Sequence, residues 1–291
     1  MKTQILTFAS AAALVSLLAA PAAHAQISTP QPSPKSTVTQ RVGLTDITLT
    51  YSRPSVKNRA VFGNLVPFGK RWRTGANATT SLKISDDVTI EGKKIPAGEY
   101  GIYTIPNKAE WLVVINKSTK QGADVDGFKD DQDVARFSVK PYKLGSKVET
   151  FTLNFSDLTP ATATVEMQWE LTGVKFKITA DVEPKVMAQI TEKVINNPTA
   201  TPADMAAAAV YYSGNDKDPK QALAWMEKAN AAEPTKYWNL HSEAKMRLKM
   251  KDYAGATKVA EASRKAALED KNADYVKMNE DLMAEAKKMG K

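Results

Sequence analysis

The sequence predicts an α+β protein of two separate domains, an antiparallel β-sandwich followed by an all-α domain of helix hairpins. Over residues 37–181, apolar residues recur at every second position in short runs that turn residues interrupt. After Asp181 the composition changes to alanine, methionine, lysine and glutamate, and helix start and stop signals replace the alternation. We therefore expect the sandwich domain at residues 37–181 and the helical domain at residues 182–291.

Residues 1–25 have the pattern of a secretory signal peptide. Lys2 supplies a positive start, residues 5–20 form an apolar run, and Ala23-His24-Ala25 is a small-x-small cleavage pattern. The run is too short for a spanning helix, which needs about 20 apolar residues. We expect cleavage near Ala25, a periplasmic or secreted protein without a membrane span after cleavage, and a proline-rich linker at residues 26–36.

The sandwich is expected to contain about nine strands. Four sets of residues at period two predict strands with one buried face. They are Val88 and Ile90; Phe151, Leu153 and Phe155; Val165, Met167, Trp169 and Leu171; and Val174, Phe176 and Ile178. Turn residues separate such runs at residues 91–94, 96–98 and 172–173.

The helical part carries clear boundary signals and an internal repeat. Asp218 followed by Pro219 predicts a capped helix start, and Pro234 lies just past the end of that helix. Two of its residues, Ala222 and Glu227, recur about 34 residues later as Ala256 and Glu261, which resembles degenerate tetratricopeptide repeats. Six helices can be drawn over residues 185–288, which makes two repeats with flanking helices.

Composition excludes several classes of site. The chain has no cysteine, so it has neither disulfides nor thiolate metal ligands. After signal removal His241 is the remaining histidine, which excludes a multi-histidine zinc site and leaves a Ser-His-Asp triad to be built across both domains. The net charge of +8 favours anionic partners, but no nucleic-acid-binding module is present, and no cofactor is expected.

The candidate ligand surface lies in residues 47–85, which contain seven basic residues and no acidic one. Arginine forks bind carboxylate or phosphate through two hydrogen bonds, and an aromatic ring can stack on a sugar. The candidate ligand-binding residues are Arg53, Lys57, Arg59, Trp72, Arg73, Asn77 and Thr79. The alternative is that Trp72 belongs to the core and the cations form a solvated rim.

An acidic segment over residues 124–133 is a weaker candidate for calcium binding, because hard cations prefer several carboxylates on one turn. The candidate ligands would be Asp124, Asp126, Asp130 and Asp133. The segment lacks the bidentate glutamate of a helix-loop-helix calcium site, and a solvated acidic loop is the alternative.

Several motifs at fixed spacing resemble the bacterial domain of unknown function 2911. They are YSRPSVKNR at 51–59, FGNLVPFG at 62–69, WRTGAN at 72–77, DVTIEGKK at 87–94, PAGEY at 96–100 and DVAR at 133–136. The resemblance implies an exported protein and no assigned activity. Two positions depart from the family pattern: Ala78 replaces a usual acid, and Gln121 replaces an expected tryptophan.

The sequence as a whole favours an exported bacterial protein of unassigned activity, a non-enzymatic binding or scaffolding protein rather than an enzyme. It would use the basic-aromatic surface for an anionic or glycan ligand and the helical domain for a protein partner. The alternative is a glycan-directed hydrolase or carbohydrate-binding module that uses carboxylates on the sandwich. Those available are Glu91, Glu99, Glu110, Glu166 and Glu170.

Overall fold

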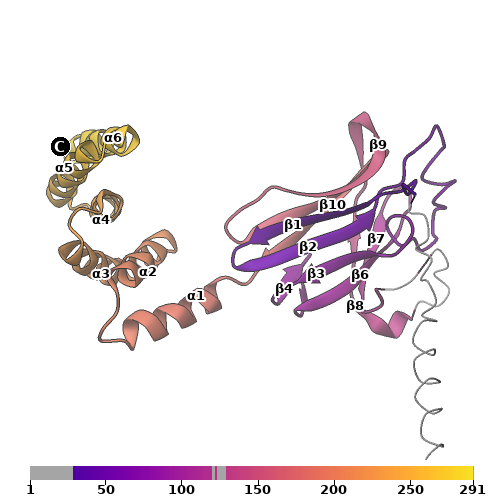
Figure 1. Ribbon diagram of the computed structural model, residues 1–291, viewed down its shortest axis with the longest axis horizontal. Coiled ribbons are helices and arrows are strands. Elements are labelled where there is room, and N and C mark those ends of the chain that lie inside the picture. The colour runs from indigo at the N-terminus through magenta and orange to yellow at the C-terminus, as the bar shows by residue number, and fades with distance from the viewer. Residues whose placement is uncertain (1–28, 120–121, 123–128, 291) are drawn as a thin grey trace, which may run out of the picture. The chain divides into compact units, whose positions relative to one another are not determined.

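The computed structural model describes residues 29–119, 122 and 129–290. The expected signal peptide, together with Asp124 and Asp126 of the acidic segment, lies outside the described residues. The chain divides into two compact units, one ending at Thr179 and one beginning at Ala180 (Figure 1). The first unit is built of strands and the second of helices, so the predicted fold class is confirmed.

The described strands of the first unit form two antiparallel sheets. One has the order β1-β2-β3-β6-β7-β8 and the other the order β5-β4-β10-β9. The strand bounds are β1 (Lys35–Val42), β2 (Thr45–Ser52), β3 (Thr80–Ile84), β4 (Val88–Ile90), β5 (Lys93–Ile95), β6 (Gly98–Ile105), β7 (Trp111–Asn116), β8 (Asp133–Val139), β9 (Tyr142–Ser156) and β10 (Thr162–Ala180). A short 3-10 turn at Asp130–Gln132 precedes β8.

Aromatic side chains from both sheets meet in one core. Tyr51 of β2 packs edge-on against Phe151 of β9, with ring centroids 5.8 Å apart. At another point Phe137 of β8 contacts Phe176 of β10 at 5.4 Å. Such edge-to-face pairs contribute beyond their buried area. Because each pair joins one sheet to the other, the two sheets face each other as a sandwich.

The period-two pattern identified the buried faces, but it misplaced one turn. Val165, Met167 and Trp169 are buried as the alternation predicts, but Leu171, expected on the same face, is 42% exposed because the pairing of β10 shifts register around Glu170. Residues 172–173, expected to be a turn, instead lie inside β10, which continues past two register shifts around Glu170. Gly173 is required there for close approach, because a Cβ at this position would lie 2.4 Å from the ring of Tyr142.

The described residues of the second unit form six α-helices, and several of these begin at a side-chain cap. Thr201 caps α2, Asp218 caps α3 and Asp252 caps α5, each by accepting backbone N–H groups of the first turn. The bounds are α1 (Glu183–Ile190), α2 (Pro202–Gly214), α3 (Pro219–Ala232), α4 (Tyr237–Lys249), α5 (Tyr253–Glu269) and α6 (Ala273–Met289), with a π-helical turn at Thr191–Ile195 after α1. Pro219 stands in the first turn of α3, and Pro234 follows its end, as predicted.

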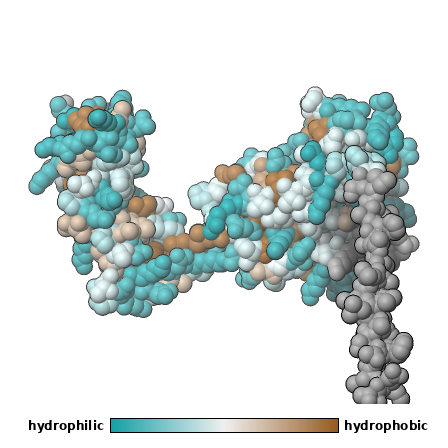
Figure 2. All heavy atoms as spheres, viewed as in Figure 1, coloured by the Kyte–Doolittle hydropathy of each residue, from teal (hydrophilic) through white to brown (hydrophobic). Residues whose placement is uncertain are grey.

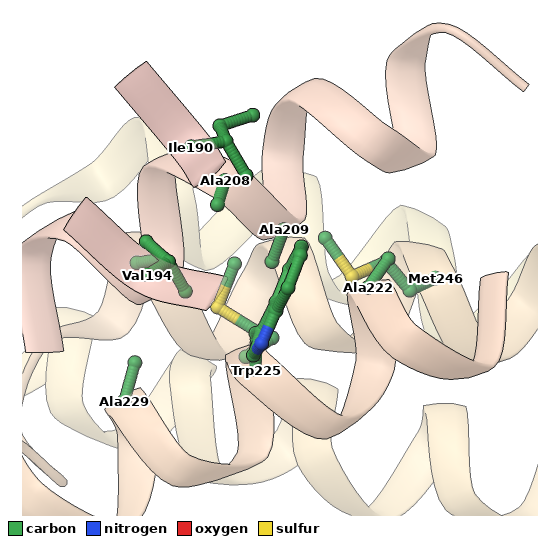
Figure 3. Close-up of a cluster of buried hydrophobic side chains, with 10 residues drawn as sticks. Ile190, Val194, Ala208, Ala209, Ala222, Trp225, Ala229 and Met246 are labelled. Carbon is green, nitrogen blue, oxygen red and sulfur yellow. The ribbon is translucent and has the colours of Figure 1, made fainter. Parts of the chain in front are cut away.

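Alanines and one tryptophan build the main core of the helical unit. Trp225 of α3 points toward Ala209 of α2, with Ala222 and Met246 nearby (Figure 3). Small side chains let the helix backbones approach closely, and the indole fills the space that remains. Alanines and methionines such as Ala222 and Met246 are therefore core residues of this unit.

The surface is mostly hydrophilic on the face that Figure 2 shows, with hydrophobic residues in scattered spots on both units. Single exposed hydrophobic residues are normal and indicate no binding site by themselves. Among the described residues, none of the helices has the length and apolar character that crossing a membrane requires.

Candidate functional site

Three arginines of residues 47–85, the basic-aromatic segment, are candidate ligand-binding residues, and the structure places them in different surroundings. Arg53 donates from Nε to the carbonyl oxygen of Phe151 at 3.1 Å and from Nη2 to Thr152 Oγ1 at 2.8 Å, so it ties the end of β2 to β9. Arg59 donates to the carbonyl oxygens of Val56 at 2.9 Å and Ser55 at 2.7 Å, which closes its own turn. Both side chains hold backbone in place.

Lys57 acts on the fold through its main chain. Its backbone N–H donates to Glu149 Oε1 at 2.8 Å, and this hydrogen bond lowers the pKa of Glu149. The residue is exposed and adopts a positive φ of 49° in the turn after Val56. The Lys57 side chain therefore belongs to the rim of the segment.

Trp72 lies in the sandwich core. Its ring stacks on Trp169 at 5.8 Å with an interplanar angle of 18° and contacts Phe151 edge-on at 5.2 Å. The indole N–H donates to the carbonyl oxygen of Gly75 at 2.9 Å. With 8% of its surface exposed, this ring supports the loop from below and presents almost no area to a ligand.

The loop after Trp72 is held in an unusual backbone conformation. Thr74 has a φ of 58°, a rare value for a β-branched residue, and is completely buried. Its hydroxyl group lies 3.1 Å from Thr104 Oγ1, and its carbonyl oxygen accepts the Thr80 hydroxyl group. Residues held in such regions cluster at functional sites, because the surrounding structure must enforce them.

Asn77 and Thr79 lie in the same loop, and their side chains form hydrogen bonds within the protein. Asn77, at a φ of 56°, donates from Nδ2 to the carbonyl oxygen of Ser33 at 3.1 Å and to Ser52 Oγ at 3.4 Å. Thr79 is buried, and its hydroxyl group lies 3.3 Å from the hydroxyl group of Tyr103. The two side chains fix the loop against the strands, and of the two Asn77 is exposed.

The Arg73 side chain forms neither an ion pair nor a hydrogen bond within the described residues. Each of the other described arginines forms at least one of these interactions. The Nε of Arg73 is shielded from solvent and has no acceptor in the described residues. Burial lowers the pKa of Arg73, and no anion of the described residues opposes this effect. Arginine remains charged at neutral pH, so the described residues contain a half-buried cation that none of them compensates.

The described end of the acidic segment is paired with arginines. Asp130 Oδ1 lies 2.8 Å from both Arg71 Nη2 and Arg136 Nη2. Asp133 pairs with Arg136 and accepts from Asn116 Nδ2 at 2.7 Å. Within residues 29–119 and 129–290, no group of three or more acidic or histidine side chains is placed to hold a metal ion.

A groove of about 380 Å³ lies at one end of the sandwich, where loop residues meet the first residues of β7 and β9 and an inner stretch of β10. Its lining residues are Phe62, Phe68, Asn107, Lys108, Trp111, Pro141, Tyr142, Lys143, Leu171 and Thr172. Two belong to the basic-aromatic segment, but sequence reasoning missed the rest. The sequence feature that could have pointed to these residues is a proline followed two positions later by a lysine, which occurs at residues 106–108 and again at residues 141–143.

A second groove, of about 560 Å³, lies between α4 and α6 of the helical unit. His241 lines it, and its Nδ1 lies 2.9 Å from Asn279 Oδ1. The amide nitrogen of Asn279 donates to Ser263 Oγ at 2.8 Å and to the carbonyl oxygen of Tyr275 at 2.7 Å, so the amide oxygen must face the histidine. Nδ1 therefore carries the proton, and Nε2 is an acceptor.

His241 should make the helical unit less stable in acid. Burial is the main reason that its pKa lies below the usual value of about 6.5. The unfolded chain then binds the proton more readily, so stability present above about pH 6.5 is lost as the pH falls through the lower, folded-state pKa. Replacing His241 by Asn keeps an N–H donor toward Asn279 without a titration. Melting curves between pH 7.5 and 5 should show a steeper loss for the wild type than for H241N, and parallel curves would contradict this.

Comparison with known proteins supports the sandwich unit as a family domain. The family model described as "Protein of unknown function (DUF2911)" matches residues 33–178, from the start of β1 almost to the end of β10. No curated protein and no solved structure gives a significant match to the chain. The matched region covers half of the chain. It contains the loop after Trp72, which carries Arg73, and the groove at the end of the sandwich. The protein therefore belongs to the DUF2911 family.

Proposed function

We propose that the protein is an exported, non-enzymatic binding protein whose sandwich unit binds an anionic ligand at Arg73. The observation that carries the proposal is the half-buried guanidinium of Arg73, which has no carboxylate or carbonyl partner in the described residues. A charge that is partly removed from water and has no partner is unfavourable for folding unless something compensates it. A ligand carboxylate, phosphate or sulfate would supply the missing acceptors in the two-bond geometry that a guanidinium fork favours.

The surrounding loop supports this role. Thr74 and Thr79 use their side chains on neighbouring hydroxyl groups, so they preorganise the loop rather than bind directly. A rigid loop reduces the ordering cost of binding. Asn77 is the exposed member, and it is the second side chain that we propose for ligand contact.

Thermal shift measurements on the full chain, with inorganic phosphate and sulfate as probes, test the proposal. An anion that binds the native state raises the melting temperature in a saturable way. Replacing Arg73 by Lys should weaken this binding by about tenfold or more, because an ammonium group lacks the planar fork. The matched control is Arg41→Lys, since Arg41 forms an exposed ion pair with Asp46 at 3.6 Å. Equal saturation curves for the wild type and R73K would refute the proposal.

We also propose that the helical unit is a protein-contact domain of the tetratricopeptide type. Asp218 and Asp252 cap α3 and α5 about 34 residues apart, which is the period of that repeat. The hairpins α2–α3 and α4–α5 then make two repeats, and α6 follows as a flanking helix. The groove between α4 and α6 runs between the first helix of the second repeat and this flanking helix, and it is where we propose that a protein partner binds.

We do not extend the proposal to glycan hydrolysis. A glycosidase needs two carboxyl groups that face each other across a cleft, about 5 to 10 Å apart. The lining of the sandwich groove, all of it within the described residues, includes no carboxylate. Of the candidate acids, Glu91 accepts the backbone N–H of Lys177 at 2.6 Å and Glu166 accepts the Tyr142 hydroxyl group, so both have structural partners.

A further inference from the structure

The groove at the end of the sandwich combines aromatic walls with positive charge. Phe62, Phe68, Trp111 and Tyr142 supply the aromatic lining, and Lys108 and Lys143 supply two ammonium groups. Its volume of about 380 Å³ falls within the range of small-molecule sites. Because its lining has no acidic side chain, the groove is complementary to an anion.

The chain builds the aromatic wall with a specific turn. Gly63 has a φ of 95°, and a Cβ on it would lie 2.6 Å from the ring of Phe68, so only glycine lets that ring lie over the turn. The backbone N–H of Gly63 donates to the carbonyl oxygen of Val66 at 2.8 Å, and that of Gly69 donates to Pro106 at 2.9 Å. These bonds fix Phe68 beside the loop that carries Asn107 and Lys108.

Tyr142 forms a fixed and uncharged part of the lining. Its ring packs against Gly173, and its hydroxyl group donates to Glu166. Burial, followed by the hydrogen bond to Glu166, raises the pKa of Tyr142 to about 12, so the phenol stays neutral at physiological pH. The charge that a ligand meets in the groove is therefore set by Lys108 and Lys143.

We infer that this groove binds a sugar residue that carries a carboxylate, the uronic-acid unit of an acidic polysaccharide. The apolar face of a pyranose ring fits the aromatic walls, and its carboxylate fits the two lysines. Asn107 and Thr172 offer polar groups for the ring hydroxyls. The inference rests on the proposed function only in that the sandwich unit binds an anionic ligand, and it assigns a set of residues that does not include Arg73.

The test compares the trimer of galacturonic acid with the neutral trimer of galactose, by titration calorimetry on the full chain. The wild type should bind the acidic trimer and bind the neutral one at least about tenfold more weakly, since charge-assisted hydrogen bonds are lost. The double substitution Lys108→Gln with Lys143→Gln should weaken binding of the acidic trimer by a similar factor. Lys93→Gln with Lys94→Gln removes the same charge from exposed positions on β5 and should leave the affinity unchanged.

Further variants separate this site from the Arg73 site. Asn107→Asp places a carboxylate in the groove and should abolish binding of the acidic trimer without unfolding the protein. Arg73→Lys should leave that binding unchanged while it weakens phosphate binding. No binding of the acidic trimer by the wild type, equal affinity for both trimers, or full affinity in the lysine double variant overturns the inference. If Arg73→Lys alone removes trimer binding, the proposed function stands and the groove assignment fails.

Discussion

Replacing Trp72 by alanine is expected to destabilise the sandwich unit by about 3 to 5 kcal/mol, the usual cost of removing a large aromatic side chain from a core. The ring stacks on Trp169, contacts Phe62 and Phe151 edge-on, and donates to the carbonyl oxygen of Gly75. Its removal would leave a cavity between the sheets and a carbonyl without its donor. Urea unfolding of the full chain, fitted with one transition for each unit, measures this loss.

The matched control for W72A is Trp238→Ala, which removes the same side chain from a position 41% exposed on α4. That change should cost about 1 kcal/mol or less, because exposed positions contribute little. A similar, small loss in both variants would mean that Trp72 is not the centre of the sandwich core. In that case the ring would again be a candidate for stacking on a ligand.

Replacing Arg247 by glutamine should destabilise the helical unit by about 3 kcal/mol, because it leaves a buried carboxylate unpaired. Arg247 on α4 contacts Glu243 at 2.8 Å, Glu227 at 2.5 Å and Asp252 at 2.8 Å. Burial alone would lower its pKa, but the hydrogen bonds and charges of these acids raise it above the usual value. The side chain of Glu243 is only 7% exposed, so water cannot replace the lost cation.

Arg264→Gln is the control for this second change. Arg264 pairs with Glu261 one turn away at 2.7 Å, but the carboxylate is about half exposed, and such pairs contribute about 1 kcal/mol or less. Thermal or urea unfolding that follows helical circular dichroism would compare the two. Equal stability of R247Q and R264Q would show that the three-acid cluster around Arg247 does not hold α3, α4 and α5 together.

The fold could be predicted because each unit repeats a short-range signal. Alternation marked the buried faces of β9 and β10, and capping residues such as Asp218 and Thr201 lie next to the helices that they start. Gly173 shows the limit of local signals. A glycine after a threonine has the composition of a turn, yet here its role is set by Tyr142, far away in the sequence.

The candidate site was less accessible to sequence reasoning, because partners decide what each cation does. Arg53 and Arg73 look alike in the sequence, but Arg53 meets acceptors on β9 and Arg73 meets none in the described residues. This difference depends on the packing of strands about a hundred residues apart. The groove is a similar case, since Lys108 comes from the loop before β7 and Lys143 from the start of β9, and only the folded sandwich brings them together.

The most direct test of the central claim is the side-chain Nε–H resonance of Arg73, followed by nitrogen-15 NMR during a titration with inorganic phosphate. Because this group is shielded from solvent, its proton should exchange slowly and give a resolved signal, which R73K identifies by its absence. We predict a saturable shift of this signal, while the Nε–H of Arg53, already bonded to Phe151, stays in place. An Arg73 signal that does not move at saturating phosphate, or that moves only together with the exposed Arg41, would contradict an anion site at Arg73.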